Sequence, residues 1–282
     1  MEIHYDPTLP EVIADPYPVY RQLRERDPVH WSEPLRAWVL TRYQDVRAAL
    51  YDRRLSADRI TPFMRRLPEA VSREVDDLGR ILKAFMNFSD PPTHTRLRAL
   101  VGKAFTPRSI DALEARIQAL VDRLIGRAED GGAVDAIAEL AGPLPLMVIA
   151  ELLGLAGGEL DLLKRWSDDL ASLIGGALKT PDKLGRAARS LREMVDYFRP
   201  LIAERRRRRG EGILDLLLAA EERGDVLSED ELLATCILLL GAGYETTTNL
   251  IGNGLLALLR HPEQLALLRR EPARMADAVE EL

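Results

Sequence analysis

The chain has 282 residues, and its 39 Lys and Arg against 45 Asp and Glu leave a formal net charge of −6. Hydrophobic residues make up 46% of it, enough for a packed core, which excludes a disordered or fibrous chain. One cysteine and four scattered histidines exclude a disulfide framework and a multi-cysteine zinc or iron–sulfur site. The acidic balance argues against nucleic-acid binding, and the N-terminus lacks the features of a secretory signal, so we expect a cytoplasmic protein.

Apolar residues recur mainly at a period near 3.6, which predicts a mainly α fold with one small β-hairpin. From the N-terminus, we expect a helix after Pro16, a hairpin over 28–31 and 37–41, a helix over 43–50, an irregular stretch or short helix over 55–68, and a helix over 71–85. Later helices are expected over about 91–104, 109–128, 145–153, 158–174, 181–208 and 212–223.

A capping box, Ser228 with Glu231 three residues later, predicts the start of a long helix. Only Glu245 is charged between 232 and 259, so a helix reaching Arg260 spans about 50 Å and is expected to be buried on nearly every side. A membrane span is the alternative, but the polar run 245–249 interrupts it and no basic flank is present. Further helices begin at prolines 262 and 272, and no repeat or linker divides the chain, so one domain is expected.

The helix that begins near Pro91 carries the first candidate site. Asp90 is expected to accept hydrogen bonds from the free N–H groups of the first turn. His94 and Arg98 lie four residues apart and therefore on one face. Two cations near a helix N-terminus oppose the helix dipole, so a bound anion, such as a carboxylate, is one explanation. A solvated basic face is the other.

Residues 241–247 of the long helix form the second candidate site. Gly241 and Gly243 each cost roughly 1 kcal/mol relative to alanine inside a helix, so we expect something to need their missing side chains, such as a flat ligand. The Thr246 hydroxyl is expected to bond the carbonyl of Ala242 and open the helix locally. Beside it, a desolvated Glu245 is a candidate proton carrier. The alternative is close helix packing, with the carboxylate reaching a buried arginine.

These two sites, in this order in a helical chain, resemble the cytochrome P-450 family of haem-thiolate monooxygenases. The segment 94–98, followed by 105–108, is similar to the family's haem-facing helix and the turn after it. The segment 242–246 resembles the oxygen-activation motif of its long central helix. Residues 275–282 resemble the start of the helix with the Glu-x-x-Arg pair, with Glu281 in the Glu position. The resemblance implies a P-450 fold truncated at its C-terminal end, with residues 1–282 as the N-terminal portion of one domain.

The resemblance also implies roles for individual residues. Those expected to bind haem b, as propionate ligands or on its distal face, are His94, Arg98, Ala242, Gly243 and Thr246. Thr246 is expected to donate a hydrogen bond to oxygen at the iron, and Glu245 to help pass protons. No residue of this chain is expected to ligate the metal, because the family's cysteine would lie beyond 282 and Cys236 falls in a run typical of core. Haem is therefore expected in the full-length parent rather than in this chain alone.

By resemblance, the function is a haem-dependent monooxygenase that inserts one oxygen atom from O2 into a small apolar metabolite, with this fragment inactive alone. A ferredoxin or flavoprotein electron donor is expected, and no nucleic acid or membrane. Substrate contacts are implied over about 56–88 and 175–184. Two alternatives stay open: a haem-free homologue that binds or activates another biosynthetic enzyme, and an unrelated helical protein that binds an amphipathic anion at His94 and Arg98. The basic run 205–209 is interpreted as a solvated helix end, where cations suit the helix dipole. The alternative is that it attracts an acidic partner.

Overall fold

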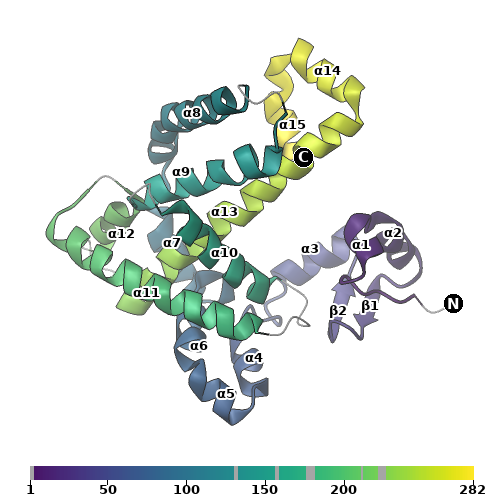
Figure 1. Ribbon diagram of the computed structural model, residues 1–282. Coiled ribbons are helices and arrows are strands. Elements are labelled where there is room, and N and C mark those ends of the chain that lie inside the picture. Colours follow the sequence, from purple (N-terminus) through teal and green to yellow (C-terminus); the bar gives the residue numbers. More distant parts are fainter. Residues whose placement is uncertain (1–2, 130–132, 156–158, 176–181, 211, 222–226) are drawn as a thin grey trace.

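The apolar period of the sequence becomes helix over most of the chain, with one two-stranded sheet near the N-terminus (Figure 1). The computed structural model describes residues 3–282 except 130–132, 156–158, 176–181, 211 and 222–226. In the N-terminal third the elements are α1 (Pro10–Ala14), α2 (Tyr17–Arg26), β1 (Val29–Ser32), β2 (Ala37–Leu40), α3 (Tyr43–Tyr51), α4 (Ile60–Arg66), α5 (Glu69–Glu74), α6 (Asp76–Lys83) and the 3-10 turn η1 (Met86–Phe88). The rest are α7 (Thr93–Gly102), α8 (Pro107–Glu129), the π-helical turn η2 (Ala136–Ala141), α9 (Pro143–Leu153), α10 (Leu160–Ile174), α11 (Lys183–Arg207), α12 (Ile213–Glu221), α13 (Glu229–Arg260), α14 (Pro262–Arg270), the 3-10 turn η3 (Pro272–Arg274) and α15 (Met275–Glu281).

The predicted hairpin is confirmed. Strands β1 and β2 pair antiparallel, and the register places Trp31 directly opposite Trp38. Their rings meet edge to face with centroids 5.4 Å apart, an arrangement that stabilises such cross-strand pairs. Both indoles remain largely exposed, at 42% and 65%. The hairpin lies with α1, α2 and α3 to one side of the main helical body (Figure 1).

Helix α13 runs through the centre of the helical body, and α9, α10 and α11 pack against it. Its predicted capping box is present: the Ser228 hydroxyl accepts from the Glu231 N–H at 3.2 Å, and the Glu231 carboxylate accepts from the Ser228 N–H at 2.8 Å. The first turns bury Leu232, Leu233 and Ile237 completely. This N-terminal half of α13 therefore anchors the main core.

Two elements differ from the expectation. The single helix expected over 71–85 is broken at Val75, whose φ of −113° and ψ of 21° separate α5 from α6. The π-helical turn η2 was not expected before α9; the Asp135 carboxylate starts it by accepting from the N–H groups of Ile137 and Ala138, each at 3.0 Å. Both features depend on local backbone geometry that the apolar period does not report.

One stretch within the described residues, Ala136–Leu153, has the length and hydropathy of a membrane span. It is not one uninterrupted helix, because η2 ends at Ala141 and α9 begins at Pro143. In α9, Leu146, Ile149 and Leu153 belong to the core, so packing inside the protein accounts for its apolar composition.

The basic run at the end of α11 is not simply solvated, in contrast to the expectation. The Arg205 guanidinium donates to the Gly154 carbonyl at 2.9 Å and lies 3.8 Å from the buried carboxylate of Asp215. Arg209 donates to the carbonyl oxygens of Asp215 and Leu218 at 3.1 and 3.3 Å. These side chains therefore fasten the end of α11 to α9 and α12.

Candidate functional site

Helix α7 begins at Thr93, after two prolines, without a side-chain cap. The expectation that Asp90 caps it is wrong. Its carboxylate instead accepts from the Ser56 hydroxyl and, at 2.8 Å, from the Ala57 N–H. The Asp90 carboxylate therefore binds partners more than thirty residues away in the chain and not the N–H groups of its own helix. The hydrogen bond from Ser56, followed by that from Ala57 and by the nearby His94, holds the pKa of Asp90 below its usual value.

His94 and Arg98 lie on the same side of α7, as predicted, next to the buried stripe formed by Leu97, Leu100 and Val101. His94 is half-buried, whereas Arg98 is exposed. Within the described part of the chain, the Arg98 guanidinium makes no hydrogen bond or ion pair. It is therefore an available cation beside a half-buried imidazole.

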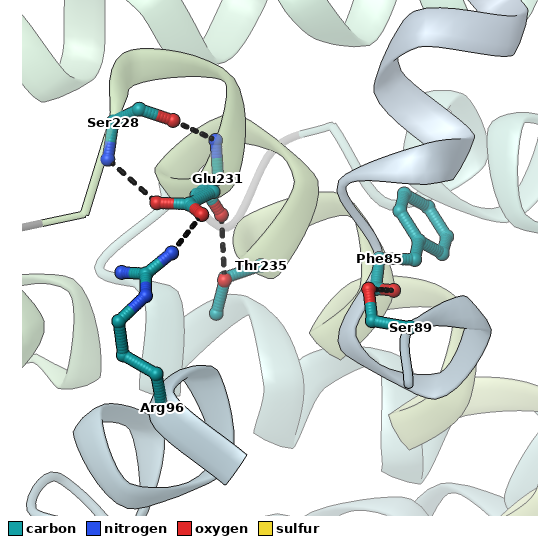
Figure 2. A network of polar contacts seen from close by, with 6 residues as sticks. All are labelled: Phe85, Ser89, Arg96, Ser228, Glu231 and Thr235. Carbon is teal, nitrogen blue, oxygen red and sulfur yellow. Dashed lines mark hydrogen bonds and ion pairs between the residues drawn. The ribbon is translucent and has the colours of Figure 1, made fainter. Parts of the chain in front are cut away.

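Arg96 leaves the opposite side of the same buried stripe and binds α13. Figure 2 shows its guanidinium paired with the Glu231 carboxylate, the group that also completes the capping box with Ser228. The Thr235 hydroxyl donates to the Glu231 carbonyl at 2.7 Å in the same cluster. The sequence indicated the cap but not this second role of Glu231. The contact fixes α7 against the beginning of α13.

The second half of α13 is not buried on every side, which corrects the expectation. Ala242, Glu245, Thr246, Asn249 and Asn253 are all exposed, and their spacing places them along one side of the helix. We call these five residues the open face of α13. Glu245 is therefore solvated and not desolvated, and it makes no ion pair with an arginine within the described residues.

The predicted Thr246 bond is present: its hydroxyl donates to the Ala242 carbonyl at 2.7 Å. The helix does not open, because α13 is continuous from Glu229 to Arg260. Thr248 makes the same type of bond, to the Tyr244 carbonyl at 2.9 Å. Back-bonding of this kind is compatible with intact helix, so the expected local defect is wrong.

The two glycines have different surroundings. A Cβ on Gly243 would lie 3.2 Å from Cδ1 of Ile149 on α9, so close helix packing explains this glycine. A Cβ on Gly241 would meet nothing within 4 Å. The open surface that we expected at both glycines is thus found at Gly241 alone.

The donor set fits part of a haem group. Arg98 and His94 suit the carboxylates at its edge, and the open face of α13 offers a helix surface for its plane. A thiolate ligand does not fit, because burial raises the pKa of the Cys236 thiol to about 12 and the side chain lies in the core. Among the described residues, no cluster of three or more His, Cys, Asp or Glu side chains is placed to hold a metal ion. The predicted site residues therefore offer groups that suit the edge and the plane of haem, and no described residue suits its iron.

The predicted site residues lie on two helices, α7 and α13, whose buried side chains belong to one hydrophobic core. No hydrogen bond or ion pair among the described residues joins His94 or Arg98 to the open face of α13. The expected substrate-contact segment over 175–184 falls partly outside the described residues. The segment over 56–88 contributes to a cavity of about 140 Å³ in which Arg59 is the polar residue, a position that no motif marked.

Comparisons of the sequence and of the fold with known proteins point to one family. The cytochrome P450 family profile matches residues 168–280. Cytochrome P450 107B1 from Saccharopolyspora erythraea is 41% identical over 270 residues, covering 93% of this chain and 64% of that protein. Cytochrome P450 CYP107DY1 from Priestia megaterium is 37% identical, over 97% of this chain and 68% of that protein.

The crystal structure of CalO2 superimposes with a TM-score of 0.86 at 37% identity, over 99% of this chain and 68% of that one. The chain spans about two thirds of the length of the relatives named here. The helical fold, its small antiparallel sheet and these relatives lead to one conclusion: the chain belongs to the cytochrome P450 family.

Proposed function

We propose that this chain is the haem-enclosing helical part of a cytochrome P450 monooxygenase that acts on a small apolar metabolite. The observation that supports this most directly is the exposed, unpaired guanidinium of Arg98 beside the half-buried His94. A cation near the N-terminal end of a helix slightly opposes the helix dipole, and a bound anion offsets that effect. The carboxylates of haem are such anions, and the family provides the cofactor.

In this proposal Arg98 donates to one carboxylate and His94 hydrogen-bonds the same edge. The ion pair of Arg96 with Glu231 holds α7 in register with α13, so the edge and the plane of the group are positioned together. When bound, haem supplies the oxygen chemistry, and the protein supplies orientation and protons.

On the open face of α13, Thr246 and Glu245 are proposed to handle protons. The Thr246 hydroxyl donates its one hydrogen bond to the Ala242 carbonyl, so in this conformation, contrary to the expectation, it does not donate to bound oxygen, and its oxygen can only accept. The exposed Glu245 carboxylate exchanges protons with water at the adjacent position. In this proposal they place a carboxylate and a hydroxyl side by side on the face of α13 that would meet the haem plane.

We propose that residues other than 1–282 supply the thiolate ligand of the iron. They also supply part of the surface that receives a ferredoxin or flavoprotein electron donor. The chain alone is then inactive. The burial of Cys236 also favours a second candidate, a haem-free relative that binds or activates another enzyme. The two candidates differ in whether the folded chain binds haem at Arg98.

Titration of the purified chain with haemin, followed by absorbance, tests the proposal. We expect saturable binding that weakens by about 10-fold in Arg98→Ala, the usual effect of losing one charge-assisted hydrogen bond. Arg116→Ala is the matched control, because Arg116 is an exposed arginine on α8. The reduced carbon-monoxide spectrum should lack a thiolate-type band.

If Arg98→Ala binds haemin as tightly as the unsubstituted chain does, the proposal that Arg98 binds a haem carboxylate is refuted. A folded chain without haemin binding would favour the haem-free candidate. A thiolate-type band from this chain would refute the statement that its iron ligand lies elsewhere.

A further inference from the structure

Tyr5 and Tyr20 lie against one another in the N-terminal part of the chain, beside the hairpin. Their ring centres are 5.9 Å apart with the ring planes inclined at 50°, and their hydroxyl oxygens are 3.4 Å apart. The carbon atoms next to each hydroxyl group are therefore close to the other ring. Among the described residues, no other two tyrosine rings are in contact.

The surroundings hold this contact in place and leave one ring able to move closer. Tyr5 is only 6% exposed, and its carbonyl accepts a hydrogen bond from the Ser32 hydroxyl of β1 at 2.9 Å. Tyr20 is part of α2, whereas Tyr5 lies in the segment before α1, outside any helix or strand. The backbone of Tyr5 is therefore less constrained than a helical backbone and can follow its ring.

The protonation of the Tyr5 phenol limits how it can react. Burial, followed by the hydrogen bond with Tyr20, raises the pKa of Tyr5 above its usual value, so this phenol stays neutral. Removal of an electron from Tyr5 must therefore be accompanied by loss of its proton, for which the Tyr20 oxygen is a neighbouring acceptor. Tyr20 is half-buried and is the member of the pair that solvent reaches more easily.

We infer that Tyr5 and Tyr20 form a modification site, at which two equivalents of a peroxide-derived one-electron oxidant join the two rings as dityrosine. Each ring gives one electron to the oxidant and its phenolic proton to water. The two phenoxyl radicals then form one bond between the carbons next to their oxygens. The hydrogen on each of these carbons moves to the oxygen and restores the phenol, so the pair loses two electrons and two protons in all.

The cross-link would tie the segment before α1 to α2. It closes a loop that contains the whole of α1 (Pro10–Ala14), and a closed loop reduces the conformational freedom of the unfolded chain. We therefore expect the joined chain to be more resistant to unfolding. The inference does not depend on the proposed haem site, because none of its residues belongs to α7 or α13.

Brief illumination of the purified chain with tris(bipyridyl)ruthenium and persulfate, which supplies a one-electron oxidant, tests this inference. Cleavage after glutamate separates the two tyrosines, because Glu11 lies between them. Mass spectrometry should then find the peptide with Tyr5 joined to the peptide with Tyr20, with two hydrogen atoms fewer than their sum. The joined peptides should show the fluorescence of dityrosine.

Tyr20→Phe should abolish the joined peptides, because it removes one phenol and keeps the ring. Tyr17→Phe is the matched control and should leave their yield unchanged. Tyr17 lies on the same helix and in the same peptide and is 71% exposed, yet it makes no ring contact with Tyr5 among the described residues. Urea unfolding establishes that each variant is folded. After illumination, the unfolding midpoint should be higher for the unsubstituted chain than for Tyr20→Phe.

Three results would overturn the inference. One is a yield of joined peptides in Tyr20→Phe equal to that of the unsubstituted chain, and another is their absence from the illuminated folded chain. The third is a bond that forms only between two chains, which a mixture of ordinary and isotope-labelled chains reveals as peptides of mixed label.

Discussion

Alanine substitutions at Gly241 and Gly243 test why α13 carries two glycines in its interior. Alanine is favoured over glycine inside a helix by roughly 0.8–1.0 kcal/mol, and this gain applies at both positions. At Gly241 a new Cβ has no neighbour within 4 Å, so nothing opposes the gain. We expect Gly241→Ala to stabilise the chain by about 1 kcal/mol.

At Gly243 the same gain meets a packed neighbour. The new Cβ would lie 3.2 Å from Cδ1 and 3.3 Å from Cγ1 of Ile149, which is only 5% exposed. Overpacking a core typically costs about 1–3 kcal/mol. Gly243→Ala should therefore be neutral or destabilising by up to about 2 kcal/mol, and less stable than Gly241→Ala by at least about 1 kcal/mol.

Urea unfolding followed by circular dichroism measures both values. Ile149→Val removes the closest methyl group, so a double-mutant cycle with Gly243→Ala should show favourable coupling of about 0.5–1 kcal/mol. Gly243→Ala as stable as Gly241→Ala, with no coupling to Ile149→Val, would show that contact with α9 is not the reason for this glycine.

Three further predictions concern stability and reactivity. Ser228→Ala removes the side-chain acceptor that caps α13 and should lower the free energy of unfolding by about 1 kcal/mol, as measured by urea titration. Ser228→Asp keeps a capping acceptor and should retain most of that stability. Cys236 should resist iodoacetamide in the folded chain and react in urea, because burial raises the pKa of its thiol to about 12; rapid native alkylation would contradict its burial. Hydrogen bonds from Arg165, first, and from Trp166 hold the pKa of Glu193 below its usual value, so the stability that it contributes is present above the unfolded pKa and is lost as the pH falls through the folded pKa. Glu193→Gln should flatten the acid side of the stability–pH curve, and an unchanged acid limb would refute this.

Features that depend on residues close in sequence could be predicted. The capping box at Ser228 and the bond from Thr246 to the Ala242 carbonyl each join groups three or four residues apart, and both are present. The hairpin also follows from the alternation of its residues, whereas the register that pairs Trp31 with Trp38 is seen in the structure. Such contacts follow from helix and strand geometry alone.

Features that depend on distant residues could not be predicted. Asp90 was expected to cap its own helix, but Ser56 competes for the carboxylate. Glu245 was expected to be desolvated because its neighbours in sequence are apolar, yet its side of α13 is uncovered among the described residues. Arg205 was expected in solvent, whereas the Gly154 carbonyl lies within its reach. In each case the tertiary neighbour, and not the residue type, decides.

The carboxylate of Asp90 joins two segments that lie far apart in the sequence. It accepts hydrogen bonds from residues 56 and 57, and it directly precedes the prolines before the helix that carries His94. One side chain therefore fixes where the earlier segment lies relative to the start of that helix, so a substitution at Asp90 disturbs both.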